Sequence, residues 1–278
     1  MSSPLSRLKF ITILVVILGA ACGELSDTNS VKNLRKQELT IYAAASLAEA
    51  FTRLGEVFES SHPNVEVVIS FAGSQQIAQQ LSQGAPGDLF ASANAKQMEN
   101  VISAGRVMSG ADQEFIQNQL MVILPGDNPG IIAGVRDLIK PGLRLILADK
   151  STPVGLYSQK MLERANQQIG FGEDYKEKVL GNVVSYEENV RAVLTKITLG
   201  EADAGIVYVS DAAGAQGGED IRMIPIPEEI NVTASYYIAP LSDSSEKDLG
   251  LDFIALVLSP EGQDILNGYG FMKLGQNE

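Results

Sequence analysis

From Glu38 onward, short apolar stretches alternate with longer stretches that have apolar residues at helical spacing. The apolar stretches are rich in β-branched and aromatic residues, and several end in glycine or a small residue, as strands do. Strands that alternate with helices of 10 to 15 residues predict βαβ units, parallel sheets and an α/β fold. The predicted strands are 39–44, 65–73, 88–93, 143–149 and 204–210, and the predicted helices are 46–60, 75–84, 95–105, 155–169, 187–199, 244–258 and 260–268.

Two further apolar strands, near 118–125 and 232–241, separate the βα units into two clusters. We interpret these strands as two crossovers between two lobes, with a ligand cleft between the lobes. The predicted N-terminal lobe comprises 38–119 plus 237–278, and the predicted C-terminal lobe comprises 120–236. In such sheets a ligand binds where strands end and helices begin.

The first 37 residues have a different character. Arg7 and Lys9 precede an apolar run of about 12 residues, which is shorter than the roughly 20 that a spanning helix needs. Small residues and Cys22 follow, so we predict a lipoprotein-type signal sequence over 1–22, lipidation of Cys22 and a flexible tether over 23–37. Gly19 occupies the position where such signals usually carry leucine. The alternative is ordinary cleavage after Ala21, and both interpretations predict an exported protein.

The composition excludes several classes of function. The net charge of −13 argues against nucleic-acid binding, and it also prevents the net charge from steering an anion to the protein. One cysteine and one histidine rule out a disulfide framework and a cysteine-rich metal site, and they nearly exclude histidine-based catalytic triads. The phosphate-binding, metalloprotease and esterase motifs are absent as well. Serine–lysine and carboxylate chemistry are not excluded by these counts, but no catalytic constellation stands out, so we expect a protein that is not an enzyme and carries no cofactor.

Four predicted helix starts offer hydrogen-bond donors to the cleft. They carry Ser46, Ser74, Val154 and Val190, and Tyr208 near the end of strand 204–210 offers a phenolic donor. Unpaired N–H groups and the positive end of the helix dipole bind anions without a formal charge.

Each candidate has a structural alternative. Ser46 with Glu49 matches a capping box, and Ser74 is equally suited to cap its helix. Tyr208 could pack at the strand end with its hydroxyl in water. Arg191, beside Val190, is either a charge in the cleft or a solvated surface residue.

Seven motifs in this order resemble the periplasmic molybdate-binding proteins of ABC transporters, which have the type II periplasmic binding protein fold. The motifs are AAASLAEAF (43–51), SFAGSQQIAQQL (70–81), GAPGDLFASA (84–93), PVGLY (153–157), ENVRAVL (188–194), GIVYVSDA (205–212) and the closing SPEGQDIL with YGF. The resemblance implies that Ser46, Ser74, Val154, Val190 and Tyr208 bind molybdate or tungstate through its oxygens, with no metal ligand from the protein. It also implies delivery to a membrane permease driven by an ATPase, by a monomer in the periplasm or on the outer face of the membrane.

Two positions depart from the family pattern. Gly73 stands where some members carry serine, and Val154 stands where alanine can occur. The resemblance implies that pocket size selects against sulfate and that a ring of donors disfavours protonated phosphate. Two alternatives remain: a binder of another small anion or organic acid on the same scaffold, and an enzyme with this two-lobed fold.

Overall fold

The computed structural model of the protein describes residues 36–215 and 221–275. The predicted signal sequence, Cys22 and the predicted tether as far as residue 35 lie outside these residues. Within the described ranges, no helix is both long enough and apolar enough to cross a bilayer.

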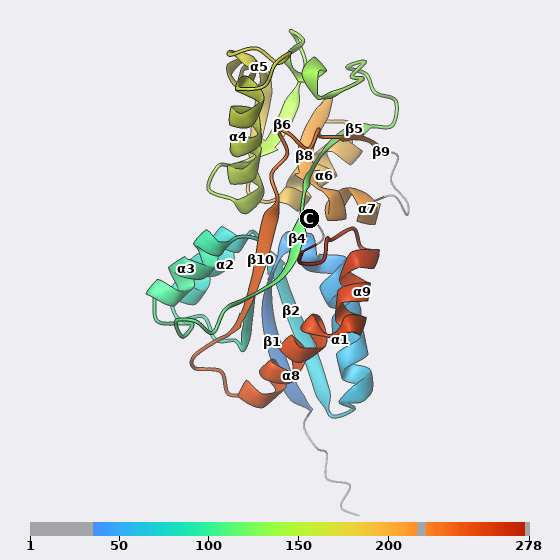
Figure 1. The fold of residues 1–278 in the computed structure, drawn as a ribbon. Coiled ribbons are helices and arrows are strands. Elements are labelled where there is room, and N and C mark those ends of the chain that lie inside the picture. Colours follow the sequence, from blue (N-terminus) through green and yellow to red (C-terminus); the bar gives the residue numbers. More distant parts are fainter. Residues whose placement is uncertain (1–35, 216–220, 276–278) are drawn as a thin grey trace, which may run out of the picture. The chain divides into compact units, whose positions relative to one another are not determined.

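Two five-stranded mixed sheets form the framework, each flanked by helices (Figure 1). In the first sheet the strand order is β2-β1-β3-β10-β4, and in the second it is β7-β6-β8-β5-β9. The α/β class and the two-lobed architecture predicted from the sequence are confirmed. We call each sheet with its helices a lobe.

The first sheet has a parallel part and an antiparallel part. Strand β1 runs parallel to β2 and β3, whereas β10 runs antiparallel to β3 and β4. The strand bounds are β1 Gln37–Ala44, β2 Val65–Ala72, β3 Leu89–Ser92, β4 Gln113–Asn118 and β10 Ala234–Pro240.

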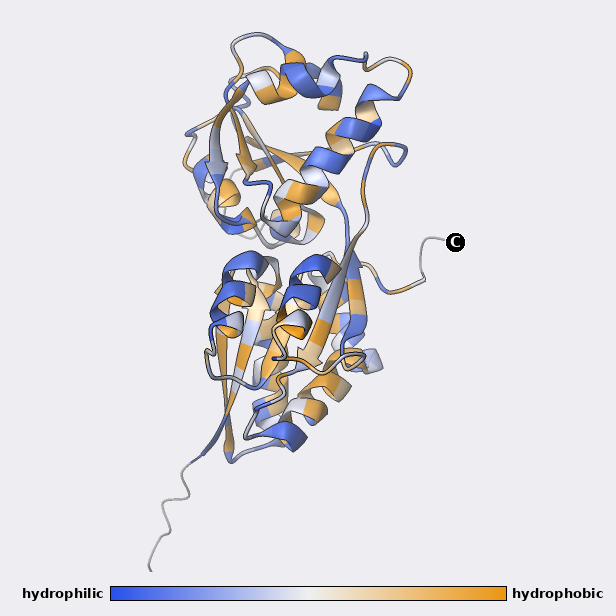
Figure 2. Cartoon of the chain, turned by 90° about the vertical axis from the view of Figure 1, so that its left-hand side faces the viewer, coloured by the Kyte–Doolittle hydropathy of each residue, from blue (hydrophilic) through white to orange (hydrophobic). Residues whose placement is uncertain are grey.

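Helices cover both faces of this sheet. On β1, Leu39 and Ile41 are fully buried in the cluster that includes α1, whereas Tyr42, on the opposite face of the strand, packs with α2 and α3. This alternation is the period of two expected of a strand, but here both faces are covered. The helices present their apolar sides to the sheet, as the colouring in Figure 2 shows. Their bounds are α1 Ala48–Ser61, α2 Ser74–Ser82, α3 Ala95–Ser103, α8 Lys247–Leu258 and α9 Pro260–Gly268, and the short 3₁₀ helix η1, Ala45–Leu47, precedes α1.

The second sheet is built in the same way. Strand β6 runs parallel to β7 and β8, and β5 runs antiparallel to β8 and β9. The strands are β5 Leu120–Pro125, β6 Leu145–Ala148, β7 Val183–Glu187, β8 Ala204–Tyr208 and β9 Ile221–Pro225. The helices are the 3₁₀ helix η2 Val135–Ile139, α4 Pro153–Asn166, α5 Tyr175–Gly181, α6 Val190–Thr198 and α7 Val209–Ala215.

The first crossover divides the apolar stretch that the sequence suggested as one strand near 118–125. Strand β4 ends at Asn118 in the first sheet, and β5 begins at Leu120 in the second. The Asn118 side chain accepts the N–H of Gln119 (2.9 Å) and donates to the hydroxyl of Ser210 (2.8 Å). An asparagine that bonds its own backbone interrupts a strand, and here the interruption lets the chain change sheets.

The second crossover, residues 226–233, is bonded to the first. Asn231 exchanges two hydrogen bonds with the backbone of Leu120, accepting its N–H (3.1 Å) and donating to its carbonyl (3.0 Å). Strand β10 then begins at Ala234, which pairs with Asn118, so the predicted lobe boundary between residues 236 and 237 falls inside β10. The two crossovers therefore form one connected strap.

Candidate functional site

A small cavity lies where strand-to-helix turns of both lobes meet. Its volume is about 20 Å³. This volume exceeds the ~10–15 Å³ of cavity that one water molecule needs, and it is far below the ~300–1,000 Å³ typical of sites for drug-sized ligands. The cavity is lined by Ala44, Ala45, Ser46, Gly73, Ser74, Ala93, Thr152, Pro153, Val154, Asn189, Val190 and Tyr208, so all five residues predicted from the sequence border it.

Ser46 reaches the cavity from the turn after β1. It is the second residue of η1, where the first N–H groups of the helix have no acceptor within it. Its hydroxyl lies 2.8 Å from the hydroxyl of Tyr236 on β10. The capping-box alternative is wrong, because no side chain caps α1 and Glu49 bonds to Arg191 instead. The sequence could not reveal Tyr236, which is 190 positions away.

Ser74 reaches the cavity from the turn after β2. Gly73 is the N-cap of α2 and Ser74 is its first residue, so the alternative of Ser74 as a cap is also wrong. The Ser74 hydroxyl accepts the N–H of Ala93 at 3.1 Å, which leaves its proton available to a ligand. The Gln76 side chain accepts the N–H of Gly73 at 3.0 Å.

Val154 follows β6 at the start of α4. Thr152 caps this helix by accepting the N–H of Gly155 (2.9 Å), and it donates to the carbonyl of Asp149 (2.7 Å). Pro153 has no N–H, so Val154 carries the first free N–H of the turn. A Cβ at Gly155 would lie 2.0 Å from the carbonyl oxygen of Asp149, so only glycine allows α4 to begin this close to the end of β6.

Val190 follows β7 at the start of α6. Asn189 caps the helix by accepting the N–H of Ala192 at 3.0 Å, which leaves the N–H of Val190 without an acceptor in the helix. Asn189 and Thr152 were not among the site residues predicted from the sequence. An asparagine or threonine directly before an apolar helical stretch is the signal that could have found them.

Tyr208 closes the cavity from the end of β8. Its hydroxyl is buried and has no hydrogen-bond partner among the described residues. The ring packs edge-on to Tyr236, with 5.8 Å between ring centroids. Burial raises the pKa of Tyr208 well above its usual value, so the hydroxyl remains a neutral donor. The alternative of a hydroxyl in water is therefore wrong.

Neutral groups dominate the cavity wall. Among the described residues that line it, none has a charged side chain. The side-chain oxygens of Thr152 and Asn189 already accept N–H groups of their own helices. In the described part of the chain, no group of three or more histidine, cysteine, aspartate or glutamate residues could hold a metal ion. The N–H groups and hydroxyls that converge on the cavity can all donate hydrogen bonds, which suits an acceptor-only anion.

A charged cluster lies beside the cavity. Arg191, next to Val190, forms ion pairs with Glu49 on α1 and with Asp211 on α7, the latter at 3.0 Å. Asp211 is fully buried, and burial raises its pKa to about 6 although the Arg191 charge opposes the shift. The alternative of Arg191 as a solvated surface residue is wrong. Asp211 was not predicted from the sequence as an ion-pair partner of Arg191.

Other polar side chains also join the lobes at the rim. The amide of Gln75 donates to the carbonyl of Glu188 (2.7 Å), and that of Gln76 donates to the Glu188 carboxylate (3.0 Å). On another side, Gln97 donates to the carbonyl of Ser151 at 3.4 Å. Contacts between the lobes thus surround the cavity.

Residues 39–272 match the family of bacterial extracellular solute-binding proteins. The chain belongs to this family. Among relatives of this solute-binding protein, the molybdate-binding protein ModA of Mycobacterium tuberculosis is 35% identical over 255 residues, which cover 91% of this chain and 92% of the relative. A second relative is the Bacillus subtilis protein YvgL, which is named as a putative ABC transporter substrate-binding lipoprotein. It is 26% identical over 259 residues, which cover 92% of this chain and 93% of the relative.

Solved structures share the fold of this solute-binding protein. The periplasmic molybdate-binding protein of Azotobacter vinelandii superposes with a TM-score of 0.72 at 21% identity, covering 84% of this chain and 98% of that one. The sulfate-binding protein SubI of Mycobacterium tuberculosis superposes with a TM-score of 0.76 at 16% identity, covering 86% of this chain and 88% of that one. These likenesses establish the two-lobed periplasmic binding protein fold.

Proposed function

We propose that this solute-binding protein captures molybdate, and tungstate by the same contacts, and delivers it to an ABC importer. The observation that carries the proposal is the convergence of Ser46, Ser74, Val154, Val190 and Tyr208 on one small cavity with neutral walls. The relative of 35% identity is named as a molybdate-binding protein, which agrees with this ligand.

Neutral donors are strong enough for this task. Hydrogen bonds to a charged acceptor contribute ~1.5–3 kcal/mol each, so the hydroxyl and N–H donors of these residues together supply on the order of 8–15 kcal/mol before association costs. Micromolar affinity requires about 8 kcal/mol. An acidic protein can therefore hold a dianion without a cationic side chain in the cavity.

Pocket size and a lining of neutral hydrogen-bond donors set the selectivity. Molybdate and tungstate are larger than sulfate, so a cavity adjusted to the larger ions holds sulfate with longer, weaker hydrogen bonds. Hydrogen phosphate carries a proton that needs an acceptor, and the acceptor oxygens of Thr152 and Asn189 are already engaged. An unpaired donor in a buried site costs ~1–3 kcal/mol.

The second candidate is another small anion on the same scaffold. The fold likeness to the sulfate-binding protein favours sulfate as that anion. A cavity of about 20 Å³ is too small for a sugar or an amino acid unless the lobes separate.

The test is isothermal titration of the protein with molybdate, tungstate, sulfate and phosphate in turn. Micromolar or tighter binding of molybdate and tungstate, with little heat from the other two, is the expected result. Tighter binding of sulfate than of molybdate would favour the second candidate. No heat with any of the four would overturn the assignment of the donor ring.

We further propose how the chain works in the cell. The lobes, 38–119 plus 237–278 and 120–236, close on the ion, and the closed monomer docks on a membrane permease driven by an ATPase. The protein is exported and tethered through lipidated Cys22, either in the periplasm or on the outer face of the membrane. The lipoprotein relative from Bacillus subtilis supports the anchor.

A further inference from the structure

We propose that Arg191 is a positioning residue that fastens the two lobes around the cavity by pairing with Glu49 of the first lobe and Asp211 of the second. The inference rests on the proposed function for its ligand, but the cluster lies outside the donor ring. Arg191 acts on the ion through the turns that it holds.

Arg191 connects two turns that border the cavity. It directly follows Val190 on α6, and its Nε donates to the carbonyl of Ala45 at 3.3 Å. The same guanidinium forms an ion pair with Glu49, in the first turn of α1. One side chain of the second lobe thus fixes both the turn after β1 and the start of α1 in the first lobe.

Asp211 forms an ion pair with the Arg191 guanidinium within the second lobe. Its carboxylate is fully buried on α7, 3.0 Å from Nε of Arg191, and has no hydrogen bond of good geometry in the described chain. A buried charge that loses its ion partner is strongly destabilising. Arg191 is therefore anchored within the second lobe and can present its remaining edge to Glu49.

Glu49 also lies near the second lobe beyond its pair with Arg191. A Cβ built on Gly214 of α7 would lie 3.5 Å from Cδ of Glu49, an ordinary van der Waals distance. Glu49 thus lies between α6 and α7 of the second lobe while belonging to α1 of the first. Separation of the lobes breaks the ion pair of Glu49 with Arg191 and moves Glu49 away from α7.

Direct attraction between Arg191 and the anion is a competing explanation. Arg191 does not line the cavity, and two carboxylates face its single positive charge. The cluster is therefore net negative and repels an anion. The two explanations predict opposite effects of removing the Glu49 charge. Direct electrostatics predicts tighter anion binding, whereas a fastening role predicts weaker binding.

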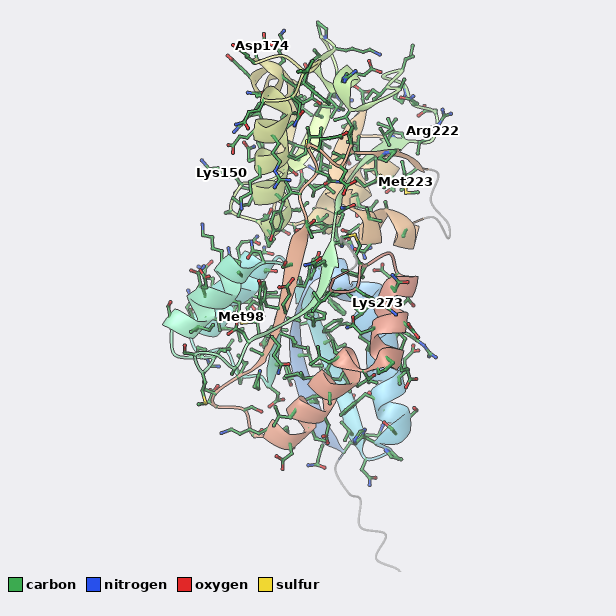
Figure 3. The ribbon with its side chains drawn as sticks, in the orientation of Figure 1. Met98, Lys150, Asp174, Arg222, Met223 and Lys273 are labelled. Carbon is green, nitrogen blue, oxygen red and sulfur yellow. The ribbon has the colours of Figure 1, made fainter. Side chains whose placement is uncertain are left out.

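Glu49→Gln in the full-length protein is the decisive variant, since it leaves Asp211 paired and the cavity lining intact. Glu56→Gln is the matched control, because Glu56 lies on the same helix and pairs with Arg53 at an exposed site. Asp174→Asn is a second control, because its pair with Lys178 lies at the end of the second lobe away from the cavity (Figure 3). Titration with molybdate should give a dissociation constant raised about two- to fivefold in Glu49→Gln and unchanged in both controls.

A distance measurement separates fastening from general damage. In a Cys22→Ser background the sequence has no other cysteine, so Ser103→Cys on α3 and Gln167→Cys at the end of α4 can carry spin labels on exposed sites of the two lobes. With molybdate at a fixed concentration near the wild-type dissociation constant, Glu49→Gln should populate longer distances than Glu56→Gln. Saturating molybdate should restore the short distance. The double variant Glu49→Gln with Arg191→Lys should bind no more weakly than Arg191→Lys alone, because both changes break the same contact.

The outcomes separate the two proposals. If the wild-type protein does not bind molybdate, the proposed function fails. If the wild type binds and Glu49→Gln binds equally well or more tightly, with unchanged label distances, the fastening role of Arg191 is overturned and the donor ring stands.

Discussion

Replacing Tyr208 with phenylalanine should make the protein more stable and make anion binding weaker. The Tyr208 hydroxyl is buried without a partner, and a buried unsatisfied hydroxyl costs ~1–3 kcal/mol. Phenylalanine removes the hydroxyl and keeps the ring that packs on Tyr236. The free energy of unfolding without ligand should therefore rise by about 1 kcal/mol, which is roughly 2–4 °C in Tm for a chain of this size.

The effect on binding has the opposite sign. The hydroxyl donates to a charged acceptor when the ion is bound, a contact that contributes ~1.5–3 kcal/mol. Its loss should raise the dissociation constant for molybdate roughly tenfold to 150-fold. Thermal unfolding without ligand and isothermal titration measure the two effects separately.

Tyr175→Phe is the matched control. Tyr175 is also buried in the second lobe, but its hydroxyl donates to the carbonyl of Val135. Its loss leaves that carbonyl unsatisfied, so Tyr175→Phe should lower Tm and leave the affinity unchanged. The reasoning is refuted if Tyr208→Phe binds molybdate with wild-type affinity, or if it lowers Tm as Tyr175→Phe does.

Three further variants test the site, the buried acid and the anchor. Ser46→Ala should weaken molybdate binding at least about fivefold by titration, since it removes a donor and its contact with Tyr236, whereas exposed Ser60→Ala should not; equal affinities would contradict a ligand role for Ser46. The pKa of Asp211 is raised from 3.8 to about 6 in the folded protein, because burial favours the protonated carboxyl. The free energy of unfolding is therefore higher at low pH and falls as pH rises from about 4 through 6 and the folded protein must hold the carboxylate. Denaturation in urea should therefore show Asp211→Asn gaining stability over the wild type as pH rises, by up to ~3 kcal/mol, and a difference that stays constant with pH would refute the shift. Cys22→Ala should release the protein from membranes in a fractionation experiment, and retention with the membranes would exclude the lipid anchor.

The sequence located residues that line the cavity because its signals are local. A glycine, serine or proline between an apolar strand and a helical stretch marks a turn, and such turns gather at the carboxyl ends of strands in an α/β sheet. Ser46, Ser74, Val154 and Val190 all border the cavity for that reason. Whether they bind the ion stays a prediction.

Contacts between distant segments could not be predicted in this way. The pairing of Ser46 with Tyr236, and of Glu49 with Arg191, depends on how the two lobes meet. A local pattern such as S-x-x-E therefore suggested a capping box where the structure uses both side chains for other contacts.

Several elements were missed or misplaced for identifiable reasons. Strand β7 is an edge strand whose Val184 and Tyr186 are exposed, so it has no continuous apolar signal, and its end was assigned to the following helix. The predicted strand 204–210 ran into α7, which begins at Val209 and buries Asp211. The short helix α5 was also missed, because seven residues give too few turns to establish a period.

The bonds between Asn231 and Leu120 have a consequence for how the ion leaves. The two crossover segments are held together at this point, so we expect them to resist sliding of one lobe past the other more than bending. Bending opens the whole cleft on one side and admits water to all the donors together. We therefore expect release to be a single event whose rate is set by the opening of the protein, and not a stepwise exchange of one hydrogen bond after another.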